Sequence, residues 1–199
     1  VAGADLSTVK TLRDPAAGEQ MARLGHAAYD LLAGGLGVPT FAFINGVALG
    51  GGLEIALACD YRTVSSGAAG IGLPEAFIGL VPGWGGVWRL PRLTGPEAAL
   101  KVMIENPLNN NRTLGGRQAF ELGIADALFE PADFLEQSLL WAASVLAGDT
   151  DVVRPHAVEP LTDAAAAERW AAAASAARAA VAAKTSNAAP APGKVLDVF

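Results

Sequence analysis

Hydrophobic positions follow two spacings along this chain, and each spacing predicts a different kind of element. From residue 15 to 32 the apolar residues recur at intervals of about 3.6 residues, which predicts a helix. Asp14 suits the cap of that helix, Pro15 its first position and Gly34-Gly35 its end. Shorter apolar runs bounded by Gly, Pro or Asn predict extended segments over residues 40–44, 60–64, 70–73 and 124–129. Strands that alternate with helices indicate the α/β class.

Glycine and proline mark further boundaries. Three consecutive glycines open a helix predicted over Leu53–Cys59, and a Gly/Pro loop is expected over residues 79–86. Pro96 suits the first turn of another helix, and Gly123 the end of a helix over 118–122.

The composition changes after residue 148. Residues 163–184 are dominated by Ala and predict a long helix, whereas 187–194, with two prolines, is expected to be a linker. We therefore predict a core over residues 1–148 and a helical tail with linker over 149–199.

Composition and charge narrow the function classes. Hydrophobic residues make up 52% of the 199 residues and charged residues 17%, so a substantial core can form. The net charge of -6 argues against a nucleic-acid surface, and no apolar run is long enough for a membrane span. The single cysteine, Cys59, allows neither an internal disulfide nor a cysteine-based metal cluster. A reducing, cytoplasmic location is the expectation that fits.

The first candidate for chemistry is Glu54, directly after the glycine run. Helix N-termini present unpaired N–H groups and a positive dipole end, and glycine lets a ligand approach that backbone closely. Because helical side chains tilt towards the N-terminus, the Glu54 carboxylate can return to the mouth near Gly51. An N–H aimed at a developing oxyanion and a carboxylate could thus meet there. The plainer reading is a first-turn partner of the helix dipole.

The second candidate is Glu75, which follows the apolar run 70–73. The loop at 79–86 can hold a backbone N–H close to it, with Gly83 as the best candidate donor. Alone, Glu75 could simply end a strand and the glycines could simply make a turn. Two carboxylates, each beside glycine-rich backbone, are a less common coincidence.

Parts of the same pattern occur in two other kinds of site, a dinucleotide-binding loop and a glycosidase active site. A dinucleotide loop needs G-x-G-x-x-G, but Ile55 occupies the third glycine position, so this reading is rejected. A glycosidase pair of carboxylates is not excluded by composition, although aromatic residues, which often stack on sugars, are only 7% of the chain.

The chain resembles the enoyl-CoA hydratase/isomerase (crotonase) family over about residues 1–130. The residues that carry the resemblance are Ala2-Gly3-Ala4-Asp5-Leu6, Asn45-Gly46-Val47-Ala48-Leu49-Gly50-Gly51-Gly52-Leu53-Glu54, Leu73-Pro74-Glu75 and Gly79-Leu80-Val81-Pro82-Gly83-Trp84-Gly85-Gly86. After residue 150 the chain is similar to the segment that follows the hydratase part of multifunctional fatty-acid oxidation α subunits.

The resemblance implies an α/β fold, a crotonase-like spiral of ββα turns whose first turns would precede Val1. It implies hydration of 2-trans-enoyl-CoA in fatty-acid β-oxidation, with no metal or redox cofactor. It also implies an acyl-CoA thioester substrate and either a homo-oligomer or a complex with a thiolase.

The resemblance further assigns roles to individual residues. Glu54 and Glu75 would hold the water, and the N–H of Gly83 would assist. The N–H groups of Ala4 and Gly51 would bind the thioester oxygen. Residues near the CoA adenine would be Ala2 and Leu6.

Two alternatives to hydration stay open at this stage. Shifting a double bond between the 3 and 2 positions can run with one acid/base carboxylate, so the presence of both Glu54 and Glu75 favours hydration. The other alternative is a catalytically silent segment that serves only as an assembly surface.

Overall fold

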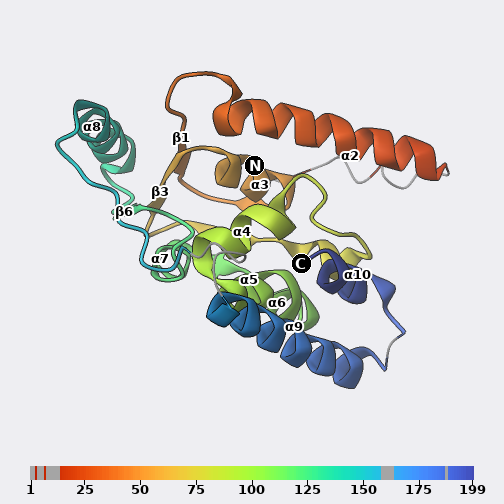
Figure 1. Ribbon diagram of the computed structural model, residues 1–199. Coiled ribbons are helices and arrows are strands. Elements are labelled where there is room, and N and C mark those ends of the chain that lie inside the picture. Colours follow the sequence, from red (N-terminus) through yellow and green to blue (C-terminus); the bar gives the residue numbers. More distant parts are fainter. Residues whose placement is uncertain (1–2, 4–6, 8–13, 158–163, 187) are drawn as a thin grey trace.

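A computed structural model describes residue 3, residue 7 and residues 14–157, 164–186 and 188–199 (Figure 1). Its strands are β1 (Phe41–Ile44), β2 (Ala48–Leu49), β3 (Tyr61–Ser65), β4 (Ala69–Gly72), β5 (Leu114–Gly115) and β6 (Ala127–Phe129). Its helices in the first half are α2 (Pro15–Asp30), η1 (Leu31–Gly35), α3 (Gly51–Ala58), η2 (Pro74–Ile78), α4 (Gly86–Thr94) and α5 (Pro96–Leu100). Those in the second half are η3 (Lys101–Glu105), α6 (Asn106–Leu108), α7 (Gly116–Glu121), α8 (Phe134–Ala147), α9 (Ala164–Thr185) and α10 (Pro190–Val198).

The strands form two small sheets, which the chain visits alternately from β1 to β4. One sheet has the order β1-β3-β6 and is parallel throughout. The other has the order β2-β4-β5, in which β2 and β4 are parallel and β5 is antiparallel to β4. Two successive repeats, β1-β2-α3 and β3-β4-η2, therefore each place one strand in each sheet. This is the α/β arrangement of strand, strand and helix that the sequence predicts.

Helix α3 lies in the core between these repeats. Every residue of α3 except Ile55 is buried, and Leu53 is fully enclosed. A helix that is apolar on nearly all sides is stable only inside the protein. The core positions of α3, β4 and η3 pack in one cluster, so the start of α3 is held rigidly against the neighbouring strand ends.

Helix α2 lies on the outer surface, as its exposed side chains require (Figure 1). Asp14 caps the helix, because its Oδ1 accepts the Ala16 N–H at 3.0 Å. The prediction for this helix is confirmed. It contacts α3, and its Gly25 lies directly against the Trp84 ring, which leaves no room for a Cβ at that position.

The Ala-rich segment forms helix α9, as predicted, and α9 packs against α5 and η3. The linker expected over residues 187–194 is wrong. Pro190 begins helix α10, where its missing N–H costs nothing, and Ala191, Val195 and Leu196 are buried against the core. The rings of Trp170 and Phe199 stack at 5.3 Å and join α9 to the end of α10. The division into units 1–148 and 149–199 stays a prediction.

In the part of the chain that the structure describes, no helix has the length and apolar character needed to cross a membrane.

The sheet β1-β3-β6 is fixed to the following segment by a buried charge network. Asp126 accepts the Arg62 N–H at 2.8 Å, and its Oδ2 lies 3.4 Å from the Arg62 guanidinium, where both side chains are about 97% buried. Arg154 binds the other oxygen of Asp126 at 2.7 Å. Removing one partner from such a network leaves an uncompensated charge in the interior.

We therefore expect Asp126→Ala to lower the free energy of unfolding by about 3–5 kcal/mol, measured by urea denaturation. A matched control is Glu19→Ala, which breaks the exposed Glu19–Arg23 pair and should cost only about 0.3–0.5 kcal/mol. Equal losses in the two variants would contradict a special role for the buried network.

Candidate functional site

Glu54 lies in the first turn of α3 and is almost completely enclosed, with 2% of its surface exposed. Its Oε1 accepts two backbone N–H groups, from Trp84 at 2.8 Å and from Gly86 at 2.9 Å. Burial raises the pKa of the Glu54 carboxyl above its usual range, and the two N–H groups offset part of that rise. These donors stabilise the ionised form of this carboxylate.

Glu75 has different surroundings. It is the second residue of η2, rather than the end of a strand, and 9% of it is exposed. Its Oε2 is buried and has no hydrogen-bond partner in the described part of the chain. Burial, and to a smaller extent the negative charge of Glu54, raise the pKa of Glu75 to about 7, although a hydrogen bond from the backbone of Glu75 lowers it. This carboxyl group therefore tends to keep its proton.

Two glycines make room for the carboxylates. Gly50 has a φ of 55°, in the left-handed region, and a Cβ at that position would lie 2.7 Å from Oε1 of Glu75. A Cβ at Gly86 would lie 3.0 Å from Oε1 of Glu54. The glycine-rich segments thus let both acidic side chains sit directly against backbone.

The start of α3 offers a place for a developing negative charge. Gly51 is its first residue, and the N–H groups of a first helical turn have no partner inside the helix. Gly3 lies beside it: its N–H donates to the Leu49 carbonyl at 3.0 Å, and a Cβ on Gly3 would lie 2.6 Å from the Gly51 nitrogen. Gly3 therefore lies at the predicted oxyanion position beside Gly51.

The predicted site residues fall into three groups. Glu54 and Glu75 lie close enough for the charge of Glu54 to act on Glu75, and Gly50, directly before Gly51, lies against the Glu75 carboxyl group. Gly83 lies in the same turn as the donors to Glu54, but the two N–H groups that reach this carboxylate are those of Trp84 and Gly86. A role for Gly83 with water stays a prediction. Ala2, Ala4 and Leu6 lie outside the described residues.

Helix α2 brings residues to this site that sequence reasoning missed. The Tyr29 hydroxyl donates to the Gly51 carbonyl at 3.1 Å, and its ring meets the Trp84 ring edge-on. Burial, and then the charge of Glu54, raise the pKa of Tyr29. Arg89 of α4 pairs with Asp30 of α2 at 2.5 Å. These contacts join elements from 22 to 59 residues apart, so no local motif could have revealed them.

The Trp84 indole covers the start of α3. A Cβ on Gly51 would lie 2.8 Å from this ring, and the indole N–H donates to the Met21 carbonyl at 3.3 Å. The ring is thereby held between α2 and α3. A ligand bound at the Gly51 N–H group would therefore lie against the Trp84 ring.

A family model and curated relatives both match this chain, and the two comparisons agree. A model of the family described as "Enoyl-CoA hydratase/isomerase" matches residues 1–190. A fatty acid oxidation complex subunit alpha of Idiomarina loihiensis is 44% identical over 128 residues, 63% of this chain and 17% of its own length. The subunit alpha of Shewanella halifaxensis is 37% identical over 160 residues, covering 78% and 21%. The chain thus spans about a fifth of these curated relatives.

Solved structures agree at the level of fold. An enoyl-CoA hydratase from Geobacillus kaustophilus superposes with a TM-score of 0.62 at 32% identity, covering 72% of this chain and 52% of that one. Pseudomonas aeruginosa DspI superposes with a TM-score of 0.63 at 31% identity, covering 92% and 66%. The chain therefore shares the fold of these structures over the parts that superpose.

Proposed function

Because this chain belongs to the enoyl-CoA hydratase/isomerase family, we propose that it carries the site that adds water across the 2,3 double bond of a 2-trans-enoyl-CoA. In this proposal Glu54 and Glu75 are the acid/base pair. The N–H group of Gly51, with that of Ala4, binds the thioester oxygen. Gly83 assists the water, and Ala2 and Leu6 lie near the CoA adenine.

The observation that carries the proposal is the unequal environment of two coupled carboxyl groups. Glu54 receives two N–H donors, which favour its charged form. Glu75 has a buried oxygen without a partner and a pKa of about 7, which favours its neutral form. Such a pair holds one proton between two groups near neutral pH, so one group can act as base while the other acts as acid.

The steps follow from that state. The Glu54 carboxylate accepts a proton from water as the water oxygen attacks the β-carbon. The electrons of the double bond move towards the thioester, and negative charge collects on its oxygen. The Gly51 N–H at the helix N-terminus stabilises that charge. Glu75 then gives its proton to the α-carbon. The product is a 3-hydroxyacyl thioester, and the single proton now resides on Glu54.

Double-bond isomerisation is the alternative within the same family. Moving one proton from one carbon to another needs only one acid/base group. Burying a second carboxyl group beside the first costs free energy. Hydration uses both groups, because one activates the water while the other protonates the α-carbon. The presence of both groups supports hydration.

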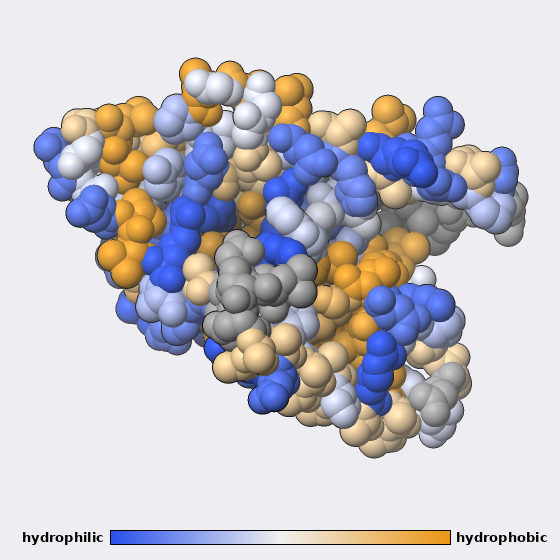
Figure 2. Space-filling view, viewed as in Figure 1, coloured by the Kyte–Doolittle hydropathy of each residue, from blue (hydrophilic) through white to orange (hydrophobic). Residues whose placement is uncertain are grey.

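The surface beside Glu75 supports an acyl substrate. Phe77 and Ile78, which follow Glu75 in η2, are 56% and 45% exposed. Hydrophobic side chains gather on the surface between α2 and the tail helices (Figure 2). Apolar surface next to a reacting centre suits the hydrocarbon part of an acyl thioester.

The names of the relatives suggest a setting. We propose a role in fatty-acid β-oxidation, within a homo-oligomer or a complex with a thiolase, because relatives such as that of Idiomarina loihiensis are called subunits of a fatty acid oxidation complex. In this proposal residues 1–148 form the hydratase core, and 149–199 a helical tail that packs on it.

The deciding experiment incubates the intact protein with crotonyl-CoA and, separately, with a 3-enoyl-CoA. Hydration predicts loss of the conjugated thioester and formation of 3-hydroxybutyryl-CoA. Conversion of the 3-enoyl to the 2-enoyl thioester, without hydration of crotonyl-CoA, would establish isomerase activity instead. Inactivity of the intact protein towards both would favour an assembly role.

The pKa of Glu75 leads to a pH prediction. This group must carry its proton in the free protein, so kcat/KM for crotonyl-CoA should fall as the pH rises through about 7. Dehydration of the 3-hydroxyacyl thioester should show the same fall, because both directions use the pair with one proton. A profile that stays flat from about pH 5 to 9 would contradict the assignment of Glu75 as the acid.

A further inference from the structure

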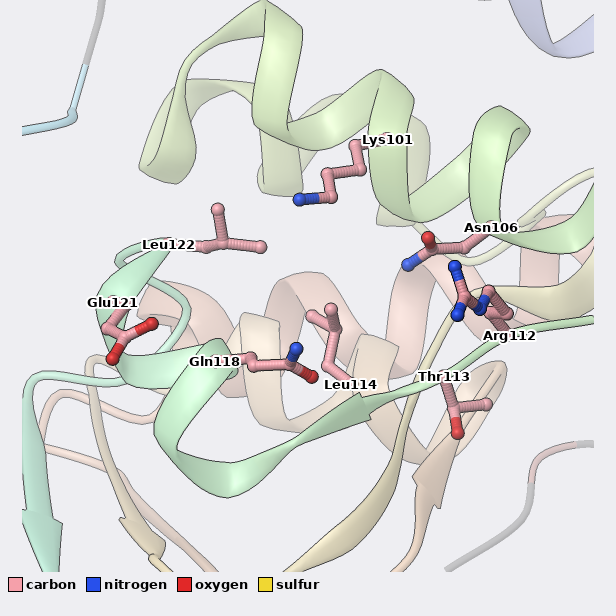
Figure 3. Close-up of a pocket in the computed structure, with 8 residues that line it drawn as sticks. All are labelled: Lys101, Asn106, Arg112, Thr113, Leu114, Gln118, Glu121 and Leu122. Carbon is pink, nitrogen blue, oxygen red and sulfur yellow. The ribbon is translucent and has the colours of Figure 1, made fainter. Parts of the chain in front are cut away.

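A pocket lies between η3, α6, β5 and α7 (Figure 3). Its volume is about 380 Å³, within the size range of small-molecule sites. The lining residues are Lys101, Asn106, Arg112, Thr113, Leu114, Gln118, Glu121 and Leu122. Neither Glu54, Glu75 nor Gly51 is among them, so this pocket is distinct from the proposed hydration site.

The pocket is lined by two cationic side chains, Lys101 and Arg112, and by one acidic side chain, Glu121. Neither Lys101 nor Arg112 forms an ion pair with any residue that the structure describes. Lys101 extends from η3 into the open space, and Arg112 lies against Asn106 at the opposite end from Glu121 (Figure 3). In five of the eight ion pairs of the described chain both side chains are exposed, so exposure alone does not explain why Lys101 and Arg112 form none.

Two amide groups add donors that local structure orients. Gln118 accepts the N–H of Gly115, the N-cap residue of α7, with its Oε1 at 3.0 Å. That bond turns the Gln118 nitrogen towards the pocket (Figure 3). Asn106 is held because its carbonyl accepts the N–H of Arg112 at 2.9 Å, and its side-chain nitrogen also faces the pocket. Lys101, Arg112, Asn106 and Gln118 thus present donors to one space.

We propose that this pocket binds a phosphate monoester of a small organic molecule. With Glu121 counted, Lys101 and Arg112 leave the lining with a net positive charge, which favours an anion such as a monoester with its charge of about -2 near neutral pH. A guanidinium group, an ammonium group and two amides suit an anion with three free oxygens. Leu114, which is 4% exposed, and Leu122 supply apolar contact for the organic part. The volume leaves room for both parts.

The test is calorimetric titration of the intact protein with phenyl phosphate and, separately, with inorganic phosphate. Phenyl phosphate should bind more tightly than inorganic phosphate, because only the ester places carbon against the two leucines. Lys101→Gln and Arg112→Gln should each weaken phenyl phosphate binding by at least about tenfold, since each removes a charge-assisted hydrogen bond. These exposed side chains can be changed without loss of the folded state.

Two further variants sharpen the test. Gln118→Glu keeps an oxygen for the Gly115 N–H but places a negative charge where the amide donor was, so it should weaken binding by at least about tenfold. Lys184→Gln in α9 removes one positive charge that does not line the pocket and should change affinity less than about twofold.

Three results would overturn the proposal. The first is unchanged affinity in the double variant of Lys101 and Arg112. The second is equal affinity for phenyl phosphate and inorganic phosphate. The third is displacement of phenyl phosphate by crotonyl-CoA, which would make the pocket part of the thioester site. None of these results depends on whether the protein hydrates crotonyl-CoA.

Discussion

Replacing Glu54 or Glu75 by Gln in the intact protein should lower kcat for crotonyl-CoA hydration by about 10²–10⁴-fold, the usual contribution of a positioned acid or base. The amide has the shape of the carboxyl group, so each variant keeps the packing of a buried site. At Glu54 the amide oxygen can still accept the two N–H groups, but it no longer takes a proton from water. At Glu75 the amide has no proton to give to carbon.

The double variant and a control make this result specific. If the two groups share one proton, Glu54→Gln and Glu75→Gln together should cost little more than either alone, because residues that act as a unit are not additive. Glu97→Gln, on an exposed glutamate paired with Arg169, should leave kcat unchanged. Near-full activity of either single variant would make that glutamate structural.

Gly51→Val should abolish turnover. A Cβ on Gly51 would lie 2.8 Å from the Trp84 ring and 3.3 Å from the Gly3 Cα, so the added side chain crowds the place where the thioester oxygen would approach the helix N-terminus. The circular dichroism spectrum should remain that of a folded α/β protein, which is the measurement that separates a local block from unfolding. Gly18→Ala, where the space is open, is the control for a glycine change.

A second variant tests the cause of the Gly51 effect. Trp84→Ala removes the ring that the new side chain would meet. If Gly51→Ala is inactive and the double variant Gly51→Ala, Trp84→Ala regains turnover, glycine is needed at position 51 only to make room for the Trp84 ring. Continued inactivity supports a requirement for close approach of the ligand to the Gly51 backbone.

The sequence predicted those features that depend on neighbouring residues. Asp14 caps α2, and Gly123, with a φ of 81°, ends the turn after α7 as expected. The glycines before Glu54 start α3 and bring its carboxylate to the mouth of the helix. Each of these is a local rule that tertiary contacts reinforce.

Other features depend on distant partners and were missed or misread. Helix α4 follows the predicted loop and contains Pro91, a residue that normally argues against a helix interior. The two prolines of α10 predict a linker, but the segment is helical because the core buries its apolar residues. No local pattern predicts the raised pKa of Glu75, since the shift arises from burial and from the charge of Glu54.

The position of β3 in the middle of its sheet has a consequence for synthesis of the protein. One neighbour, β1, is made before β3. The other neighbour, β6, follows directly after Asp126, which accepts the Arg62 N–H from 64 residues further along the chain. While that stretch emerges from the ribosome, one edge of β3 has unpaired N–H and carbonyl groups, the kind of edge that recruits other strands. Contacts between residues so far apart in sequence also form slowly. The nascent chain therefore passes through an interval in which its central strand is open to aggregation, and arrival of β6 closes it.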